Sequence, residues 1–308
     1  MDQKTIEDYS EKILKLKKER KAVILAHFYQ RPEVQDVADF IGDSLGLSQQ
    51  AADTDAEVII FCGVQFMAES ASILSPGKIV VLPDEHAGCP MADMVDAVQL
   101  VRKKQEMPGA IVVCYVNTSA EVKAECDIAC TSANAVRVVE SLPPDRPILF
   151  VPDKNLGHYI VTQTGREMTL WEGWCNTHDK LTAAEVLQAK EEHPGALVMV
   201  HPECRPDVVG LADKVSSTAG MIEFAAASDA REFIVGTEMG ILHPLKKRCP
   251  DKQFYLASKK LMCPNMKKTT LDKVYRALAD LEPRVAVPAE IGERAIVCLE
   301  RMLAIKQP

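Results

Sequence analysis

The sequence predicts an α/β protein built from three homologous three-layer α/β domains, related by pseudo-threefold symmetry around a central active site. The first observation is an internal repeat, because segments beginning at Ala22, Ala110 and Ala196 align with one another without a gap. Each copy opens with a short apolar, β-branched run (AVILA, AIVVC, ALVMV), which is typical of a buried strand in a parallel sheet. A cysteine closes each copy, and the three cysteines keep nearly the same spacing as the opening strands.

The elements expected within each copy follow the same order. Apolar positions at Ile6, Ile13, Leu14 and Leu16 predict an amphipathic helix ahead of the first strand. Further apolar runs predict additional strands: EVIIFCG and KIVVLP, then PILFVP, then EFIVGT and QFYLAS. An amphipathic helical segment follows each closing cysteine: DMVDAVQLVRKKQEMPG, LTAAEVLQAKEEHPG and LDKVYRALADLEP. The predicted organisation is an N-terminal helix (1–21), three α/β repeats (22–108, 109–194 and 195–284) and a C-terminal helical segment (285–308).

Composition indicates a soluble globular protein. The chain is 47% hydrophobic and 26% charged, and its longest apolar run is too short to span a bilayer. A net charge of -8 argues against nucleic acid as a partner. The charged N-terminus lacks a secretory signal, so we expect a cytoplasmic protein. Thiols stay reduced in that compartment, so the ten cysteines are expected to be metal ligands, reactive groups or buried side chains before disulfides.

Polar residues follow the first strand of every copy. They are His27-Phe28-Tyr29, Tyr115-Val116-Asn117 and His201-Pro202-Glu203. A hydroxyl residue then occupies one aligned position before a helix-like stretch, where it is expected to be the N-cap: Ser44, Ser132 and Thr218. Ligands of open α/β sheets bind beyond the carboxyl ends of the strands, so we expect all these groups to face one cavity. Helix N-termini with hydroxyl caps bind anions, which suits a small, multiply anionic substrate.

Four of these strand-end residues are candidates for proton transfer: Tyr29, Glu203, His27 and His201. Burial at the mouth of a strand is expected to move the pKa of Glu203 upward, towards neutrality. The imidazoles of His27 and His201, together with the Asn117 amide, are expected to add hydrogen bonds to the substrate oxygens.

The three repeated cysteines are candidate metal ligands. Three thiolates are one short of a closed tetrahedral zinc site. A [4Fe-4S] cluster held by three cysteines leaves one iron free to act as a Lewis acid. The alternative is three ordinary buried cysteines, but their shared place in the repeat favours ligation. These cysteines are Cys89 in HAGCPMAD, Cys175 in EGWCNTH and Cys263 in LMCPNM.

The remaining cysteines have no counterparts in the other copies and are expected to be small buried side chains: Cys62, Cys114, Cys126, Cys130, Cys204, Cys249 and Cys298. Cys126 and Cys130 are expected to pack inside a helix, on one face. A radical-type cluster motif would need a third cysteine where Ala133 stands, so a metal role for this pair is not favoured. His178 also lacks a counterpart and is expected to line the site or support a ligand.

Several motifs together resemble the quinolinate synthase family: AHFYQ, DFIGDSL, GCPMADM, YVNTSAEVKAECD, GWCNTH, MVHPEC, SSTAGM and GTEMG, from about Lys21 to Met266. The resemblance implies three α/β domains about a pseudo-threefold axis, with Cys89, Cys175 and Cys263 binding a central [4Fe-4S] cluster. It implies a transferase of NAD biosynthesis that condenses iminoaspartate with dihydroxyacetone phosphate to give quinolinate, phosphate and water. The enzyme that supplies iminoaspartate is then a candidate partner.

The same resemblance implies roles for individual residues. The implied substrate-binding set is His27, Ser44, Tyr115, Asn117, Ser132, His201, Glu203 and Thr218. The implied catalytic set is Tyr29, Tyr115, His201 and Glu203, with Tyr29 and Glu203 the strongest acid-base candidates. Some members carry extra cysteines around the third ligand, whereas here the segment is CPNMKK, so a local disulfide is not expected.

Two other functions stay open at this point. An open iron and anion-binding caps would equally suit a [4Fe-4S] hydro-lyase acting on another small carboxylic acid. In a non-catalytic iron-sulfur sensor or electron carrier, the cysteines would only bind a redox-active cluster. The strand-end Tyr, Asn, His and Glu residues argue against the sensor, because it needs no substrate shell.

Overall fold

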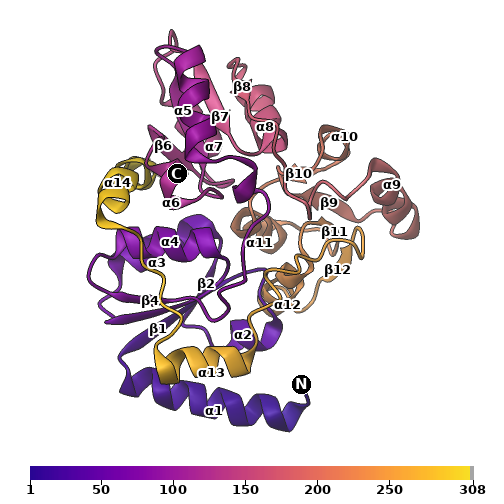
Figure 1. Cartoon of the computed structure of the whole chain (residues 1–308). Coiled ribbons are helices and arrows are strands. Elements are labelled where there is room, and N and C mark those ends of the chain that lie inside the picture. Colours follow the sequence, from indigo (N-terminus) through magenta and orange to yellow (C-terminus); the bar gives the residue numbers. More distant parts are fainter. Residues whose placement is uncertain (306–308) are drawn as a thin grey trace.

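The computed structural model, which describes residues 1–305, contains three four-stranded parallel sheets arranged around one centre (Figure 1). The predicted fold class is confirmed. The strand orders are β2-β1-β3-β4, β6-β5-β7-β8 and β10-β9-β11-β12, so each sheet repeats one topology. The strands are β1 (Ala22–His27), β2 (Phe40–Gly42), β3 (Val58–Cys62), β4 (Ile79–Val81), β5 (Ile111–Tyr115), β6 (Ile128–Cys130), β7 (Ile148–Val151), β8 (Thr169–Leu170), β9 (Leu197–Val200), β10 (Lys214–Val215), β11 (Glu232–Gly236) and β12 (Gln253–Leu256).

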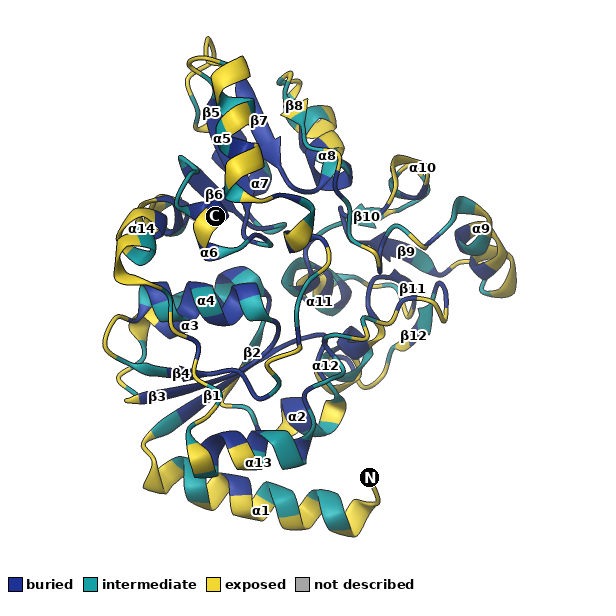
Figure 2. Cartoon of the chain, in the orientation of Figure 1, coloured by how far each residue is buried: buried dark blue, intermediate teal, exposed yellow. Residues whose placement is uncertain are grey.

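Helices cover both faces of the sheets, which explains why the central strands are apolar throughout (Figure 2). In the first sheet, Ile24 and Ile60 pack with α1 and α13, while Leu25 and Ile59 pack with α3 and α4 on the other face. The helices are α1 (Gln3–Glu19), α2 (Pro32–Val37), α3 (Ser44–Asp53), α4 (Gln65–Leu74), α5 (Ala97–Glu106), α6 (Ala120–Lys123), α7 (Ala135–Glu140), α8 (Lys154–Thr164), α9 (Ala183–Glu192), α10 (Pro206–Val209), α11 (Thr218–Ala227), α12 (Leu242–Arg248), α13 (Leu271–Asp280) and α14 (Ala289–Ala304), with short 3-10 turns η1 (Ala92–Met94) and η2 (Met239–Ile241). Within residues 1–305, none of these helices combines the length and the apolar character that a bilayer crossing demands.

One polar contact recurs at the same aligned position of all three copies. A carboxylate accepts a hydrogen bond from a backbone N–H group of the first strand. The pairs are Asp39 with Ile24 at 2.8 Å, Asp127 with Val112 at 2.8 Å and Asp213 with Val198 at 2.7 Å. The repeat therefore extends from strand order down to individual hydrogen bonds.

The last two helices pack away from the third sheet. α13 lies beside α1 on the first sheet, where Val274 and Leu278 share a core with Ile13. α14 packs against α6 and β6 of the second sheet and buries Cys298 and Met302. The domain ranges stay a prediction, although α13, placed in the third range, covers the first sheet. Residues 306–308 of the expected C-terminal segment lie outside the described residues.

The sequence missed the four short strands β2, β6, β8 and β10 that flank the predicted ones. This corrects the expected helix around Cys126 and Cys130. Cys130 lies in β6, where it pairs with Tyr115 of β5, and Cys126 lies between α6 and β6, with its Sγ donating to Val122 O at 3.0 Å. Pairing with the neighbouring strand overrides the helical spacing of the two cysteines.

Candidate active site

All the residues selected from the sequence line one cavity at the centre of the molecule, where the carboxyl ends of the three sheets meet. The cavity is therefore a shared site to which every copy contributes. The selected residues are His27, Tyr29, Ser44, Cys89, Tyr115, Asn117, Ser132, Cys175, His201, Glu203, Thr218 and Cys263. Their roles remain predictions, whereas their convergence is a property of the fold.

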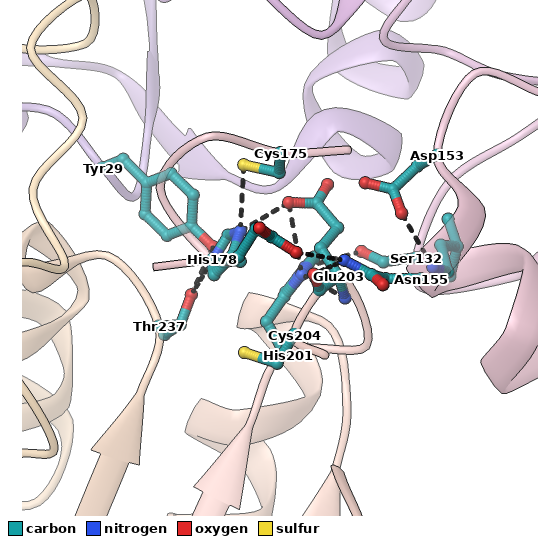
Figure 3. A network of polar contacts seen from close by, with 12 residues as sticks. Tyr29, Ser132, Asp153, Asn155, Cys175, His178, His201, Glu203, Cys204 and Thr237 are labelled. Carbon is teal, nitrogen blue, oxygen red and sulfur yellow. Dashed lines mark hydrogen bonds and ion pairs between the residues drawn. The ribbon is translucent and has the colours of Figure 1, made fainter. Parts of the chain in front are cut away.

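The buried carboxylate of Glu203 lies at the centre of a hydrogen-bond network (Figure 3). Its Oε1 accepts from the Tyr115 hydroxyl at 2.5 Å, and its Oε2 lies 2.5 Å from His178 Nδ1 and 3.6 Å from His201 Nδ1. Burial alone would raise the pKa of Glu203, but the hydrogen bonds from His178 and Tyr115 stabilise the charged form and hold the pKa below its ordinary value. The expected upward shift is wrong, because these hydrogen bonds outweigh desolvation.

His27 and His201, at the carboxyl ends of β1 and β9, share one tautomer. His27 Nδ1 accepts from the backbone N–H of Tyr29 at 3.1 Å, and His201 Nδ1 accepts from that of Glu203 at 3.3 Å. Burial lowers the pKa of both imidazoles to about 3, so each ring is neutral and carries its proton on Nε2. His201 Nε2 lies 3.2 Å from Ser132 Oγ. Both rings can therefore donate a hydrogen bond to an oxygen of a bound molecule.

The neutral histidines predict a pH-dependent stability. In the unfolded chain each imidazole binds a proton below its ordinary pKa of 6.5, whereas in the folded protein it does so only near 3. The unfolded state thus holds more protons between these values, and stability falls as the pH is lowered from 6.5. Each histidine contributes up to about 1.4 kcal/mol per pH unit.

Urea unfolding of the anaerobically purified protein between pH 7.5 and 5 checks this expectation. H27N and H201N retain an acceptor near the Nδ1 position and should each reduce the pH slope. His158 is exposed, so H158N serves as the matched control and should keep the wild-type slope. An unchanged slope in both H27N and H201N would contradict the assignment of neutral rings.

The two cavity tyrosines are hydrogen-bond donors. Burial, aided by the Glu203 carboxylate, raises the pKa of Tyr29 and Tyr115 well above the usual value. The Tyr29 hydroxyl lies 2.5 Å from Thr237 Oγ1 and 3.4 Å from His178 Nε2. Tyr29 is therefore connected through His178 to the Glu203 carboxylate.

His178 lines the cavity and contacts Cys175, as the sequence predicted, but it also makes contacts that the sequence did not predict. Its Nδ1 contacts both Glu203 and the Cys175 Sγ, at 2.5 and 3.2 Å, and its Nε2 lies 2.8 Å from Thr237 Oγ1. Comparison of the copies favours residues that have counterparts, and His178 and Thr237 have no polar counterparts at these positions. Only the short spacing between Cys175 and His178 pointed towards this contact.

The aligned hydroxyl residues are not the N-caps that the sequence predicted. Asp43 and Ser217 cap α3 and α11 one residue earlier, so Ser44 and Thr218 are the first helical residues. Ser132 lies in the turn before α7, whose N-cap is Asn134. Asp and Ser are both good caps, so Asp43 and Ser217 take that role in the first and third copies, and Ser44, Ser132 and Thr218 line the cavity.

The three repeated cysteines reach the cavity from loops of different copies and are all half-buried. Burial raises the pKa of each thiol, that of Cys89 to about 12. Thiolates in this position therefore need a compensating cation, which fits a site for iron. A second donor set is also present, because ligand atoms of Cys175, His178 and Glu203 all lie within 4.8 Å of one another.

Comparison with known proteins agrees with this arrangement. The chain matches the family described as Quinolinate synthetase A protein over residues 11–304. The quinolinate synthase of Desulforudis audaxviator is 61% identical over 293 residues, covering 95% of this chain and 97% of that protein. The quinolinate synthases of Methanoregula boonei and Geobacter metallireducens are each 55% identical over 295 residues, covering 96% of this chain and 97% of each protein. The chain belongs to the quinolinate synthase family of enzymes.

Proposed function

We propose that this quinolinate synthase condenses iminoaspartate with dihydroxyacetone phosphate, giving quinolinate, phosphate and water, at a [4Fe-4S] cluster held by Cys89, Cys175 and Cys263. The observation that carries the proposal is that one thiol from each copy lines the same cavity as the proton-transfer and anion-binding groups. When bound by three cysteines, such a cluster supplies an open iron that polarises a substrate oxygen or nitrogen. A cytoplasmic location and a place in NAD biosynthesis belong to the same proposal.

Substrate oxygens would be held by groups from all three copies. Ser44 and Thr218 begin ten-residue helices, so their hydroxyls and the first backbone N–H groups favour a carboxylate or a phosphate. Ser132, the Asn117 amide and the Nε2–H groups of the two strand-end histidines supply further polar contacts. Lys180 also lines the cavity and adds a cationic group for a substrate with several anionic groups.

Proton transfer would involve Glu203 and Tyr29. Glu203 is ionised and would accept a proton released as the carbon skeletons join, while Tyr29 is protonated and would donate one to a departing oxygen. His178 lies between the two groups, within 2.5 Å of Glu203 and 3.4 Å of the Tyr29 hydroxyl. It connects the acceptor to the donor so that a proton could return between turnovers.

The proposal is tested by anaerobic purification followed by an assay with freshly generated iminoaspartate and dihydroxyacetone phosphate. Quinolinate and phosphate are expected in equal amounts from cluster-replete protein. Phosphate release without quinolinate, or neither product, would reject the condensation. Dehydration of another small hydroxy acid by the same preparation would instead favour the hydro-lyase alternative.

A single divalent ion on the second donor set is the competing metal site, and His178 distinguishes the two. His178 belongs to the set with Cys175 and Glu203 but not to the three repeated cysteines. We expect H178A to retain the wild-type content of iron and acid-labile sulfide per chain. Its activity should fall, since Glu203 and Tyr29 lose their shared contact. Loss of metal from H178A, with retention in C89A, would favour the single-ion site.

A further inference from the structure

A fully buried lysine supports the turn that carries Asn117. Lys123, the last residue of α6, is 0% exposed. Its Nζ donates to the carbonyl of Val116 at 2.8 Å and to the carbonyl of Thr118. These carbonyls lie on either side of Asn117. A single amine therefore binds the backbone on both sides of the residue that faces the cavity.

The first copy contains the same device with a different side chain. Gln35 of α2 stands as far beyond Tyr29 as Lys123 stands beyond Asn117, and it is 1% exposed. Its Nε2 donates to the carbonyls of Phe28 and Gln30 at 3.0 and 2.9 Å, on either side of Tyr29. Two copies therefore use aligned residues of unlike chemistry for one hydrogen-bonding task.

The third copy has no equivalent side-chain donor at the aligned position. The aligned residue is Val209, which has no side-chain donor. The turn there is held differently, because Asn155 Nδ2 donates to the backbone carbonyl of Glu203 at 3.2 Å (Figure 3). The Glu203 side chain is itself fixed by Tyr115 and His178. The third copy therefore holds its turn by a donor from a different segment of the chain.

Packing alone does not account for these side chains. Lysine is almost never fully buried, because leaving water costs free energy that an apolar residue of the same length would not incur. The flanking carbonyls supply the compensation, since buried acceptors also need donors. Burial lowers the pKa of Lys123, yet a neutral amine still offers one N–H group to each carbonyl. The Asn117 Oδ1 has no hydrogen-bond partner within residues 1–305, which leaves it for a ligand.

We propose that Lys123 and Gln35 are positioning residues, which fix the Asn117 amide and the Tyr29 phenol at the cavity by binding the carbonyls on either side of them. The kinetic consequence rests on the proposed function, in which Asn117 binds substrate and Tyr29 donates a proton. The effect on the two turns themselves does not depend on the identity of the reaction.

The test compares K123M with K123Q in the cluster-replete enzyme. Methionine preserves length without a donor, whereas glutamine reproduces the donor of the first copy. K123M is expected to lower kcat/KM by about 100-fold, mainly by raising KM, because a displacement of about 1 Å at a substrate contact has that effect. K123Q should restore most of this loss. Q35M should instead act mainly on kcat, since Tyr29 moves a proton.

Hydrogen exchange measured by mass spectrometry supplies the readout that is independent of activity. The backbone of residues 115–119 should exchange faster in K123M than in the wild type, and the turn at 201–204 of the same molecule is the internal control. V209A, the aligned substitution in the third copy, should change neither exchange nor kinetics. If the wild type makes no quinolinate, the proposed function fails while the exchange comparison still stands.

Three outcomes would overturn the positioning role. Unchanged exchange at 115–119 in K123M would show that the amine does not hold the turn. Faster exchange with unchanged KM and kcat would show that the hydrogen bonds of Lys123 do not determine how the site binds substrate. An equal loss of kcat in K123M and Q35M, with KM unchanged and less folded protein, would indicate a purely structural effect.

Discussion

Replacement of Glu203 by glutamine is expected to abolish quinolinate formation while leaving the iron-sulfur content unchanged. The substitution preserves the size of the side chain and its ability to accept a hydrogen bond from Tyr115, which now lies 2.5 Å from Oε1. It removes the negative charge that the hydrogen bonds from His178 and Tyr115 stabilise. An amide cannot accept a proton as a general base, so kcat should fall by about 100- to 10,000-fold.

The control for this experiment is an exposed glutamate far from the cavity. Glu192 at the end of α9 is exposed, and E192Q should behave as the wild type. Iron and sulfide analysis of E203Q must accompany the assay, because Glu203 also belongs to the donor set with Cys175 and His178. Turnover within a few fold of the wild type would remove Glu203 from the mechanism. Loss of iron together with turnover would assign Glu203 a role in metal binding instead.

The internal repeat made most of the site predictable from sequence. Because all three copies end their first strand at the same edge, aligned polar residues such as Tyr29, Asn117 and Glu203 had to converge if the copies surround one axis. The same symmetry located Cys89, Cys175 and Cys263, although nothing in a single cysteine distinguishes a ligand from a buried thiol. Aligned position therefore carried more information than residue type.

The contacts that the repeat could not predict are those that only one copy makes. His178 has no counterpart in the other copies, yet it contacts Glu203, Cys175 and Thr237. The pKa of Glu203 likewise depends on side chains from distant segments, which no local pattern reveals. Gln35 and Lys123 perform one task with unlike side chains, so residue identity conceals their equivalence.

The remaining differences between prediction and structure concern where a helix begins and which sheet a helix covers. A helix start is set by the best available cap, and Asp43 precedes Ser44 in that role by one residue. α13 follows the last cysteine in sequence but packs beside α1, where the two helices share the apolar core on one face of the first sheet. Periodicity identified α13 as a helix without indicating which sheet it would cover.

Substitution of single cysteines is expected to show which of the ten cysteines bind the cluster and which do not. C89A, C175A and C263A should each lose the broad iron-sulfur absorbance and fall from four irons per chain to nearly none. Each thiol supplies one of only three protein ligands, and two thiolates are too few to retain the cluster. All activity should disappear with the cluster.

The matched control is Cys126, which is half-buried like the three candidates but donates to the Val122 carbonyl away from the cavity. C126A should keep wild-type absorbance, iron content and activity. C130A should also keep its cluster, because Cys130 is buried in β6. The buried variant tests whether cluster loss follows from destabilisation alone, and its melting temperature should be compared with those of the three ligand variants.

The results for the five variants decide between two explanations of cluster loss: the loss of a ligand and the loss of overall stability. If the thiols bind iron, loss of the cluster follows position in the cavity and is independent of burial, so C89A fails while the more deeply buried C130A does not. If the cluster depends only on overall stability, the loss should follow the melting temperature in all five. Retention of a full cluster in C89A or C263A would leave Cys175, His178 and Glu203 as the metal site and would reject the three-cysteine assignment.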